Sequence, residues 1–356
     1  MQKLNESRQS LNKTRTIRIL RIIMPIVGII SAVIFVPWNA VFLWLTPVSD
    51  TVQGELRHAI DRGFDGIIVY VDQAGEDPAL YAAGWNNRAE QIPANPQSLF
   101  KIGSISKLYI ATATVMLVND GVLSLDDTLA DHFPELVGQI ANADRITLRM
   151  MLQHRSGIPN YVDYPDWNWA DPPSNLNSYL TFVIDKPADF EPDSRYSYSN
   201  TNYLFIGNIL DKVLGYSHHQ YIRDEILTPL GLTDTYSLLS EIDLEDLVSG
   251  YHHDIEPDLK EIEFISPAGS MIATAQDTGI FLRALNDGSL LDDDEQAMYS
   301  SVYKYDHTGW VLGFQSIARY DKDTDTVVVL FANSTGGETE ATIHILFDRI
   351  MGIARK

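Results

Sequence analysis

The amino-acid sequence predicts an α+β fold, in which a mostly antiparallel sheet is flanked by helices and a helical region is inserted between its strands. Strand-like runs occur early in the chain, at residues 66–75 and 80–85, and again near its end, at 310–320 and 326–333. The patterns between them are mainly helical, so the sheet must be assembled from distant segments. An Asp-Lys-Asp turn joins the last two runs into an antiparallel hairpin. This argues against a purely parallel, doubly wound sheet.

The N-terminal segment predicts a membrane anchor. Residues 22–45 contain no charged side chain, and a helix of about 20 such residues crosses a bilayer core of about 30 Å. The apolar run exceeds the roughly 7–15 residues of a cleavable signal peptide, so we expect it to be retained as a transmembrane helix. Residues 1–21 carry six basic side chains and one acidic one, a net charge of +5. They are expected to be a cytoplasmic tail, which places the body of this single-pass protein in the periplasm or outside the cell.

The remaining elements follow from patterns along the chain. Residues 47–50 are expected to be a short tether, and apolar residues at helical spacing predict a helix over 51–62. A polar turn at 76–78 joins the first two strands. A last helix is expected over about 340–353. Residues 50–356 are therefore expected to form one folded domain.

Charge and cysteine content exclude several classes of function. The net charge is −22, so the chain beyond residue 21 carries −27, and such an acidic body repels nucleic-acid phosphates. The chain contains no cysteine, which rules out disulfides and thiolate metal sites. Its adjacent histidine pairs, at 218–219 and 252–253, lack the spacing of a helical metal site. We expect no nucleic-acid partner, no metal and no cofactor.

A serine three residues before a lysine is the spacing that serine acyl enzymes use for a nucleophile and its base. It occurs four times, at Ser10/Lys13, Ser98/Lys101, Ser104/Lys107 and Ser301/Lys304. Ser104 alone opens a long helical pattern, which ends at Gly121. At a helix N-terminus free backbone N–H groups stabilise an anion, and Lys107 lies one turn later on the same face. Of the four serines, Ser104 is therefore favoured as the nucleophile because of its place at the start of a helix. It is also expected to be the N-cap of that helix.

Two further stretches carry side chains that suit the same chemistry. Tyr198 lies in YSYSNTNY, and a tyrosine near a buried lysine gives up its proton more easily and can act as a general base. Asn200 can accept from a lysine and donate to a substrate carbonyl. His307, Thr308 and Gly309 stand just before the strand expected at 310–320. The glycine lets a substrate lie against the strand edge, and the threonine offers a hydroxyl to a carboxylate or carbonyl.

Five blocks in order make the sequence resemble the β-lactamase-related serine hydrolases, which comprise class C β-lactamases, D-Ala-D-Ala carboxypeptidases and related esterases. The blocks are FKIGSISKLYIA, VNDGVLSLDDTLADHFPEL, ITLRMMLQHRSGIPNY, FEPDSRYSYSNTNYLFIGNIL and SPAGSMIATAQDTGIFLRAL. The resemblance covers roughly residues 55–350. It implies the β-lactamase/transpeptidase type of α/β sandwich and a serine hydrolase activity.

The resemblance implies a role for each matching residue. Ser104 would be the acylated nucleophile and Lys107 its partner in proton transfer. Tyr198 would be the general base in acylation and the acid toward the leaving group. Asn200 would help to hold Lys107 and the substrate amide. The block around His154 is expected to support the site without taking part in catalysis.

The same resemblance extends to the segment at residues 307–310. His307 stands where many members have lysine, and Thr308 would bind the acidic end of the substrate, with Gly309 in the same substrate-binding stretch. The backbone N–H groups of Ser104 and Trp310 would form the oxyanion hole, a large term in acyl-transfer catalysis.

The sequence departs from the family pattern at three places. His307 is shared with some D-Ala-D-Ala peptidases, while class C β-lactamases usually have lysine there. A histidine that titrates near pH 6.5 predicts that KM for a carboxylate substrate increases as the pH rises through about 6.5. The interval from Tyr198 to His307 is short for a class C β-lactamase, and Asp193 follows Pro192 where the family often has glycine.

The sequence therefore predicts a membrane-anchored serine hydrolase that acts through an acyl-Ser104 intermediate. A D-Ala-D-Ala-type carboxypeptidase or amidase is favoured, with an acyl-D-amino acid, an ester or a β-lactam as its small-molecule or peptide substrate. An esterase or β-lactamase of the same fold is one alternative. A non-catalytic penicillin-binding or sensor module is another, although all of the expected catalytic side chains are present.

Overall fold

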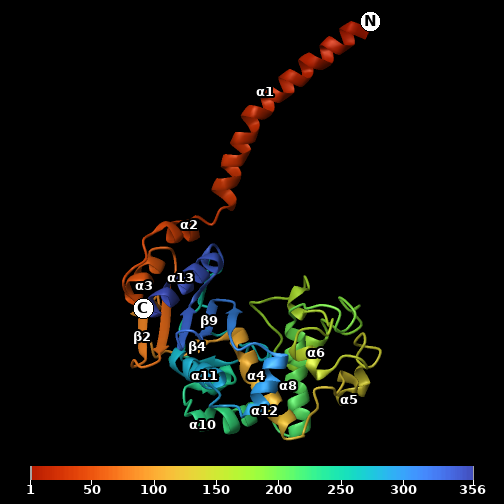
Figure 1. Ribbon diagram of the computed structural model, residues 1–356, viewed down its shortest axis with the longest axis vertical. Helices are drawn as coiled ribbons and strands as arrows, with labels where there is room; N and C mark the ends of the chain where they lie inside the picture. Colours follow the sequence, from red (N-terminus) through yellow and green to blue (C-terminus); the bar gives the residue numbers. More distant parts are fainter. Residues whose placement is uncertain (1, 356) are drawn as a thin grey trace.

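A six-stranded antiparallel sheet lies at the centre of the folded body, with strand order β3-β2-β1-β10-β9-β8 (Figure 1). The computed structural model describes residues 2–355, and it describes the side chains of residue 17 and of residues 19–355. Strands from the two ends of the chain meet where β1 pairs with β10, as the sequence predicted. The central strands are β1 (Gly66–Gln73), β2 (Ala79–Asn87), β3 (Ile92–Pro93), β8 (His307–Val311), β9 (Phe314–Asp321) and β10 (Thr326–Ala332). The smaller strands are β4 (Phe100–Lys101), β5 (Thr235–Tyr236), β6 (Tyr251–His252), β7 (Ile272–Ala273) and β11 (Ser334–Thr335).

Helices cover both faces of this sheet. Side chains alternate along a strand, so in β1 Ile67 packs toward α3 and α13, whereas Ile68 packs toward α11 and the helical region. Figure 1 shows the helical region around α4, α6, α8 and α12 beside the sheet. The longer helices are α1 (Gln2–Phe35), α2 (Trp38–Leu45), α3 (Val52–Ile60), α4 (Ser106–Asn119), α8 (Asn200–Leu214), α11 (Ala275–Asp287), α12 (Asp293–Val302) and α13 (Thr339–Ala354). The shorter ones are α5 (Leu129–His132), α6 (Leu148–Leu152), α7 (Leu176–Leu180), α9 (His218–Ile222) and α10 (Thr228–Leu230).

The predicted fold class is confirmed for the body, with one strand boundary corrected. The strand expected over 310–320 is wrong, because the chain forms two strands there, β8 and β9, joined by a tight turn. Gly313 in this turn has φ +88°, a conformation that side chains rarely adopt. His307, Thr308 and Gly309 consequently lie within β8 and not in front of a strand.

The N-terminal apolar segment is broken into two helices. No single helix among the described residues is long and apolar enough to cross a membrane, but Ile19–Phe35 and Trp38–Leu45 pass that test together, with a bend of 83° between them. The break falls at Val36 and Pro37, since proline lacks an N–H and disfavours helix in the residue before it. The side chains of Ser10 and Lys13 lie outside the described residues.

The second of these helices, α2, is attached to the folded body. Leu43 is fully buried against α13 and its neighbours. From α13, the guanidinium of Arg349 donates to the carbonyl oxygens of Leu43 and Thr46, each at 2.8 Å, and of Pro47 at 3.0 Å. It also pairs with the fully buried Glu55 of α3 at 2.7 Å. The folded body thus begins at α2, earlier than the boundary at residue 50 that the sequence suggested.

Candidate active site

Ser104 lies at the junction of the sheet and the helical region. It belongs to a short 3₁₀ turn, Gly103–Ile105, between β4 and α4. The N-cap of α4 is Ile105, with no capping side chain, so the expectation that Ser104 caps this helix is wrong. Its hydroxyl is occupied by other groups: Lys107 Nζ lies 2.9 Å from Ser104 Oγ, and the Tyr198 hydroxyl lies 2.8 Å from it.

Lys107 is completely buried, and its amine has three neighbours. Besides Ser104, its Nζ donates to Asn200 Oδ1 at 2.8 Å and to the backbone carbonyl of Ala268 at 2.6 Å. Burial lowers the pKa of Lys107 well below its usual value, and the charge of Lys304 lowers it further. A neutral amine has two N–H donors and one lone pair. The two acceptors take the donors, and the lone pair then faces the hydroxyl of Ser104.

Tyr198 reaches the same serine from the segment before α8. Burial raises its pKa, and the hydrogen bond with Ser104 only partly opposes that effect. The sequence-based expectation that Tyr198 gives up its proton readily is therefore not met in this structure. Because Lys107 is shifted in the opposite direction, the protonated phenol and the neutral amine are the favoured pair.

Asn200 is oriented by a residue that the sequence reasoning missed. Asn160 Oδ1 accepts from the backbone N–H of Asn200 at 3.0 Å and from its amide nitrogen at 3.3 Å. These bonds turn the Asn200 oxygen toward Lys107. Asn160 is the next-to-last residue of the sequence block that contains His154, and its place in that block was the signal that could have identified it.

His154 supports Tyr198 from behind, as the sequence suggested. Its ring lies 4.5 Å from the Tyr198 ring, and its Nδ1 accepts from the backbone N–H of Ser199 at 3.2 Å. Burial lowers the pKa of His154 to about 3, with contributions from the charges of Lys107 and Lys304. It is a neutral packing residue.

The strand β8 runs against the turn that holds Ser104. A methyl group on Gly309 would come within 2.0 Å of the carbonyl oxygen of Ile102, so only glycine permits this approach. A methyl group on Gly103 would come within 2.9 Å of the backbone nitrogen of Trp310. The Trp310 N–H, expected to belong to the oxyanion hole, therefore lies beside the Ser104 turn. The Thr308 side chain is exposed on the same strand.

His307 is buried, and both of its ring nitrogens are occupied. Nδ1 lies 2.5 Å from the carbonyl oxygen of Thr308, which can only accept, so Nδ1 carries the proton. Nε2 then accepts from the Tyr303 hydroxyl at 2.9 Å. Burial, followed by the charges of Lys304 and Lys107, holds the pKa of His307 well below its usual value. The assumption that His307 titrates near pH 6.5 is thus corrected: it is neutral throughout the physiological range.

The departure at Asp193 is accommodated locally. Asp193 has φ +63°, the left-handed conformation in which glycine is most easily placed. Its carboxylate bonds to Arg155 Nε at 2.5 Å, and its backbone N–H donates to the Arg155 carbonyl at 2.8 Å. The segment leading to Tyr198 is held in place by this pair.

A small pocket of about 40 Å³ opens beside Ser104 on the side of Asn200 and Trp310. Its walls are largely aromatic, and the Trp169 ring stands edge-on to the Trp310 ring at 4.9 Å. The aromatic lining consists of Tyr161, Trp167, Trp169, Tyr179, Phe264 and Trp310. The sequence reasoning missed these residues, although the aromatic loop YVDYPDWNW was a visible signal.

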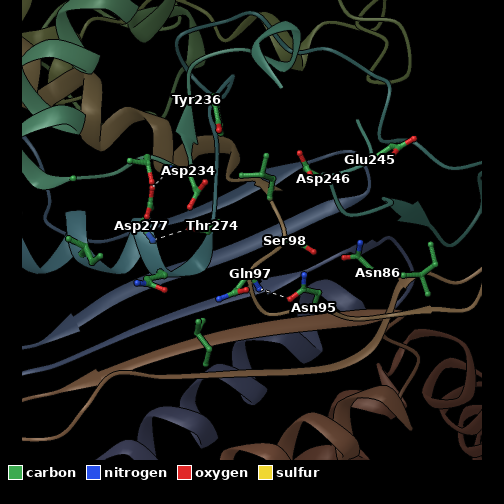
Figure 2. A pocket seen from close by; sticks show the side chains of 17 residues that line it. Asn86, Asn95, Gln97, Ser98, Asp234, Tyr236, Glu245, Asp246, Thr274 and Asp277 are labelled. Carbon is green, nitrogen blue, oxygen red and sulfur yellow. Dashed lines mark hydrogen bonds between the residues drawn. The ribbon is translucent and has the colours of Figure 1, made fainter. Parts of the chain in front are cut away.

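The other Ser-x-x-Lys pairs described by the structure do not form a nucleophile and base. Ser98 lines a separate pocket of about 600 Å³ (Figure 2), but Lys101 Nζ donates to the carbonyls of Lys260 and Ile262 instead. The lining of the pocket in Figure 2 includes many amide and carboxylate side chains, and none of the predicted site residues belongs to it. Ser301 lies at the end of α12 and donates to a backbone carbonyl there. Across the described residues, no group of three histidine or acidic side chains is arranged to hold a metal ion.

Comparisons with known proteins identify the family of this chain. The family model described as Beta-lactamase matches residues 52–305. PbpX of Bacillus subtilis (strain 168) is 27% identical over 292 residues, which cover 76% of this chain and 71% of PbpX. Penicillin-binding protein 4 of Amycolatopsis lactamdurans is 32% identical over 161 residues, 45% of this chain and 42% of that protein.

Solved structures show the same architecture. The D-amino acid amidase from Ochrobactrum anthropi SV3, complexed with L-phenylalanine amide, superposes with a TM-score of 0.74 at 26% identity, covering 85% of this chain and 97% of the amidase. A class C beta lactamase from Rhodobacter sphaeroides gives a TM-score of 0.68 at 21% identity, covering 85% of this chain and all of that one. At 21% identity, the similarity to the class C beta lactamase shows only that the two chains share a fold.

Proposed function

The chain belongs to the beta-lactamase family of serine hydrolases, and within it we propose that it acts through an acyl-Ser104 intermediate on peptides or amides of D-amino acids. The observation that carries this proposal is the placement of Ser104 Oγ between Lys107 Nζ at 2.9 Å and the Tyr198 hydroxyl at 2.8 Å. A nucleophile flanked by a base and an acid has what acyl transfer requires. The amidase and penicillin-binding neighbours support the substrate class.

Acylation begins with proton transfer from Ser104 to Lys107. The neutral amine accepts the hydroxyl proton as Oγ attacks the substrate carbonyl, and the backbone N–H groups of Ser104 and Trp310 stabilise the oxyanion. Tyr198 donates its proton to the leaving nitrogen, and the proton held by Lys107 then restores the phenol. This assigns the base to Lys107, whereas the family resemblance assigned it to Tyr198.

Deacylation uses the same groups in the reverse order. A water molecule takes the position of the leaving group, loses a proton toward Tyr198 and Lys107, and attacks the acyl carbonyl. Ser104 leaves as the hydroxyl. The aromatic pocket beside Ser104 suits an apolar acyl side chain, because such walls exclude water and offer large contact areas.

Covalent labelling of the full-length protein in detergent tests this assignment. We expect a fluorophosphonate to add one adduct to the parent protein and none to Ser104→Ala, as measured by intact mass. A lasting penicillin adduct on the parent would favour a D-Ala-D-Ala peptidase, and fast consumption of penicillin would favour a β-lactamase. A folded parent protein that gives no fluorophosphonate adduct would contradict the proposal and support a non-catalytic module.

We also propose that the chain is anchored in a membrane with its tail in the cytoplasm. Residues 19–35 would span about 25 Å as a helix at 1.5 Å per residue, close to the thickness of a bilayer core. The 83° bend would then place α2 along the membrane surface. Its exposed Trp38, Phe42 and Trp44 are residues typical of that interface.

The absence of cysteine makes the orientation directly testable. Single cysteines introduced as Val48→Cys and Ser10→Cys can be treated with a membrane-impermeant maleimide in intact cells. We expect labelling at position 48 only, and labelling at position 10 as well after permeabilisation. Labelling at position 10 in intact cells, or release of the protein by alkaline carbonate, would contradict the anchor.

A further inference from the structure

Two separate pockets adjoin the reacting pair, one at each of its two hydroxyl groups. The aromatic pocket contains Ser104 and Trp310 but not Tyr198. A second pocket, of about 300 Å³, contains Tyr198 but not Ser104. We call it the Lys304 pocket, and it is lined by Leu152, Gln153, His154, Tyr196, Tyr198, Ser300, Val302, Tyr303 and Lys304.

The leaving group belongs on the side of the Lys304 pocket. In the proposed mechanism the leaving nitrogen takes its proton from Tyr198, so it must lie against the phenol. The acyl group stays on Ser104 and fills the aromatic side. The chain passes the two pockets in sequence. Lys304 lies before β8 and lines the pocket expected to hold the leaving group, and Trp310 lies within β8 and lines the aromatic pocket expected to hold the acyl group.

Lys304 is a cation without an anionic partner in this part of the fold. Its side chain is exposed, and among the described side chains no carboxylate lies within ion-pair distance of it. Asp306, two residues away, pairs instead with Arg319 at 3.5 Å. The charge of Lys304 nevertheless acts on the reacting centre, because it adds to burial in lowering the pKa of both Lys107 and His307.

His307 cannot supply a positive charge for a substrate carboxylate. It is neutral, its Nδ1–H is bonded to the Thr308 carbonyl, and its Nε2 accepts from Tyr303. The position at which many relatives carry a lysine therefore lacks a cation in this chain. Lys304 lies three residues earlier, on the leaving side of Tyr198.

We propose that Lys304 and its pocket bind the free carboxylate of the leaving D-amino acid, with the exposed hydroxyl of Thr308 as a second donor. This inference rests on the proposed function and narrows it: the preferred substrates are peptides that end in a free carboxylate. Neutral amides and esters lack the group that Lys304 recognises. The site thus favours a carboxypeptidase over an amidase.

A pair of matched substrates isolates this interaction. Full-length protein in detergent would be assayed with N-acetyl-D-alanyl-D-alanine and with its C-terminal amide, which differ only in the terminal charge. We expect Lys304→Met to lower kcat/KM for the carboxylate substrate about five- to tenfold, the size of a partly solvated charge interaction. Any effect of Lys304 on the Lys107 amine is shared by both substrates, so the ratio of the carboxylate rate to the amide rate isolates the carboxylate contact, and this ratio should fall about five- to tenfold. Lys304→Arg should keep most of the preference, and Lys322→Met, in the exposed turn between β9 and β10, should leave both rates unchanged.

Binding to Ser104→Ala separates this proposal from the chemistry. We expect this variant to bind the carboxylate dipeptide more tightly than the amide, and Ser104→Ala/Lys304→Met to bind both alike. Equal binding of the two dipeptides by Ser104→Ala, binding of neither, or an equal loss for both on Lys304→Met would overturn the role of Lys304. A carboxylate preference in binding without an acyl-enzyme in the parent would uphold it and reject the proposed acyl transfer instead.

Discussion

Replacing Arg349 by methionine should destabilise the protein more than any exposed arginine does. The guanidinium makes five hydrogen bonds: three to carbonyls in the last turn of α2 and just after it, and two to Glu55, at 2.7 and 3.0 Å. Glu55 is fully buried, and removing one partner of a buried ion pair costs about 3–5 kcal/mol. For a body of this size that corresponds to a fall in Tm of roughly 5–8 °C.

Thermal unfolding of the full-length protein in detergent, followed by circular dichroism, measures this difference. Arg319→Met is the matched control, because Arg319 is only partly buried, keeps its aliphatic stem as methionine, and makes long ion pairs, at 3.5 and 3.7 Å. Its loss should cost less than about 1 kcal/mol. If Arg349→Met lowers Tm no more than Arg319→Met does, α2 is not held by this pair and the reasoning fails.

The charge left on Glu55 gives a second signature. Burial alone would raise the pKa of Glu55, but the bonds from Arg349 and Ser49 outweigh it and bring the pKa below the usual value. In the parent, this contribution to stability is present above the ordinary glutamate pKa of about 4.3 and is lost only as the pH falls through the lower folded value. Without Arg349 the buried carboxyl becomes easier to protonate, so the destabilisation should shrink as the pH falls toward about 4. Glu55→Leu/Arg349→Met should be more stable than Arg349→Met alone.

Three further predictions concern the site. KM for a carboxylate substrate should stay flat between pH 5.5 and 7.5 in steady-state assays, because His307 is neutral over that range. An increase of KM through pH 6.5 would show instead that His307 titrates there and binds the carboxylate as a cation. The acylation rate should rise with pH along an acid limb, because the neutral form of Lys107 is the base, and stopped-flow labelling should show a midpoint far below 10.5. Gly309→Ala should abolish fluorophosphonate labelling, since its methyl group would meet the Ile102 carbonyl, whereas Gly352→Ala, with open space around it, should label normally.

The sequence was sufficient where the relevant contacts are local or follow the order of motifs. Ser104 and Lys107 are three residues apart, and the short 3₁₀ turn that leads into α4 brings their side chains together locally. The two terminal hairpins carry their turn and strand signals within about 25 residues each. The split of β8 from β9 was missed because a single glycine, Gly313, makes the turn inside an otherwise continuous apolar run.

The hydrogen bonds that determine the protonation states of the site residues could not be predicted from the sequence. The Lys107 amine donates a hydrogen bond to the backbone carbonyl of Ala268. Every residue has such a carbonyl, so the amino-acid sequence does not indicate which one accepts this bond. The tautomer of His307 depends on Tyr303 and on its own neighbour's carbonyl. Likewise, α2 reads as the end of a membrane span until Arg349, about 300 residues later, is seen to hold it.

The surroundings of Lys107 fit a proton that moves during the reaction. With the pKa of Lys107 lowered and that of Tyr198 raised, the resting pair carries no buried charge, which avoids the large penalty for an isolated ion. When Ser104 transfers its proton, an ammonium forms at Nζ. The oxygens of Asn200 and Ala268, at 2.8 and 2.6 Å, already point at that atom, so the new charge is stabilised without rearrangement. The same two acceptors that orient the neutral lone pair toward Ser104 therefore also favour the state in which Ser104 has become a nucleophile.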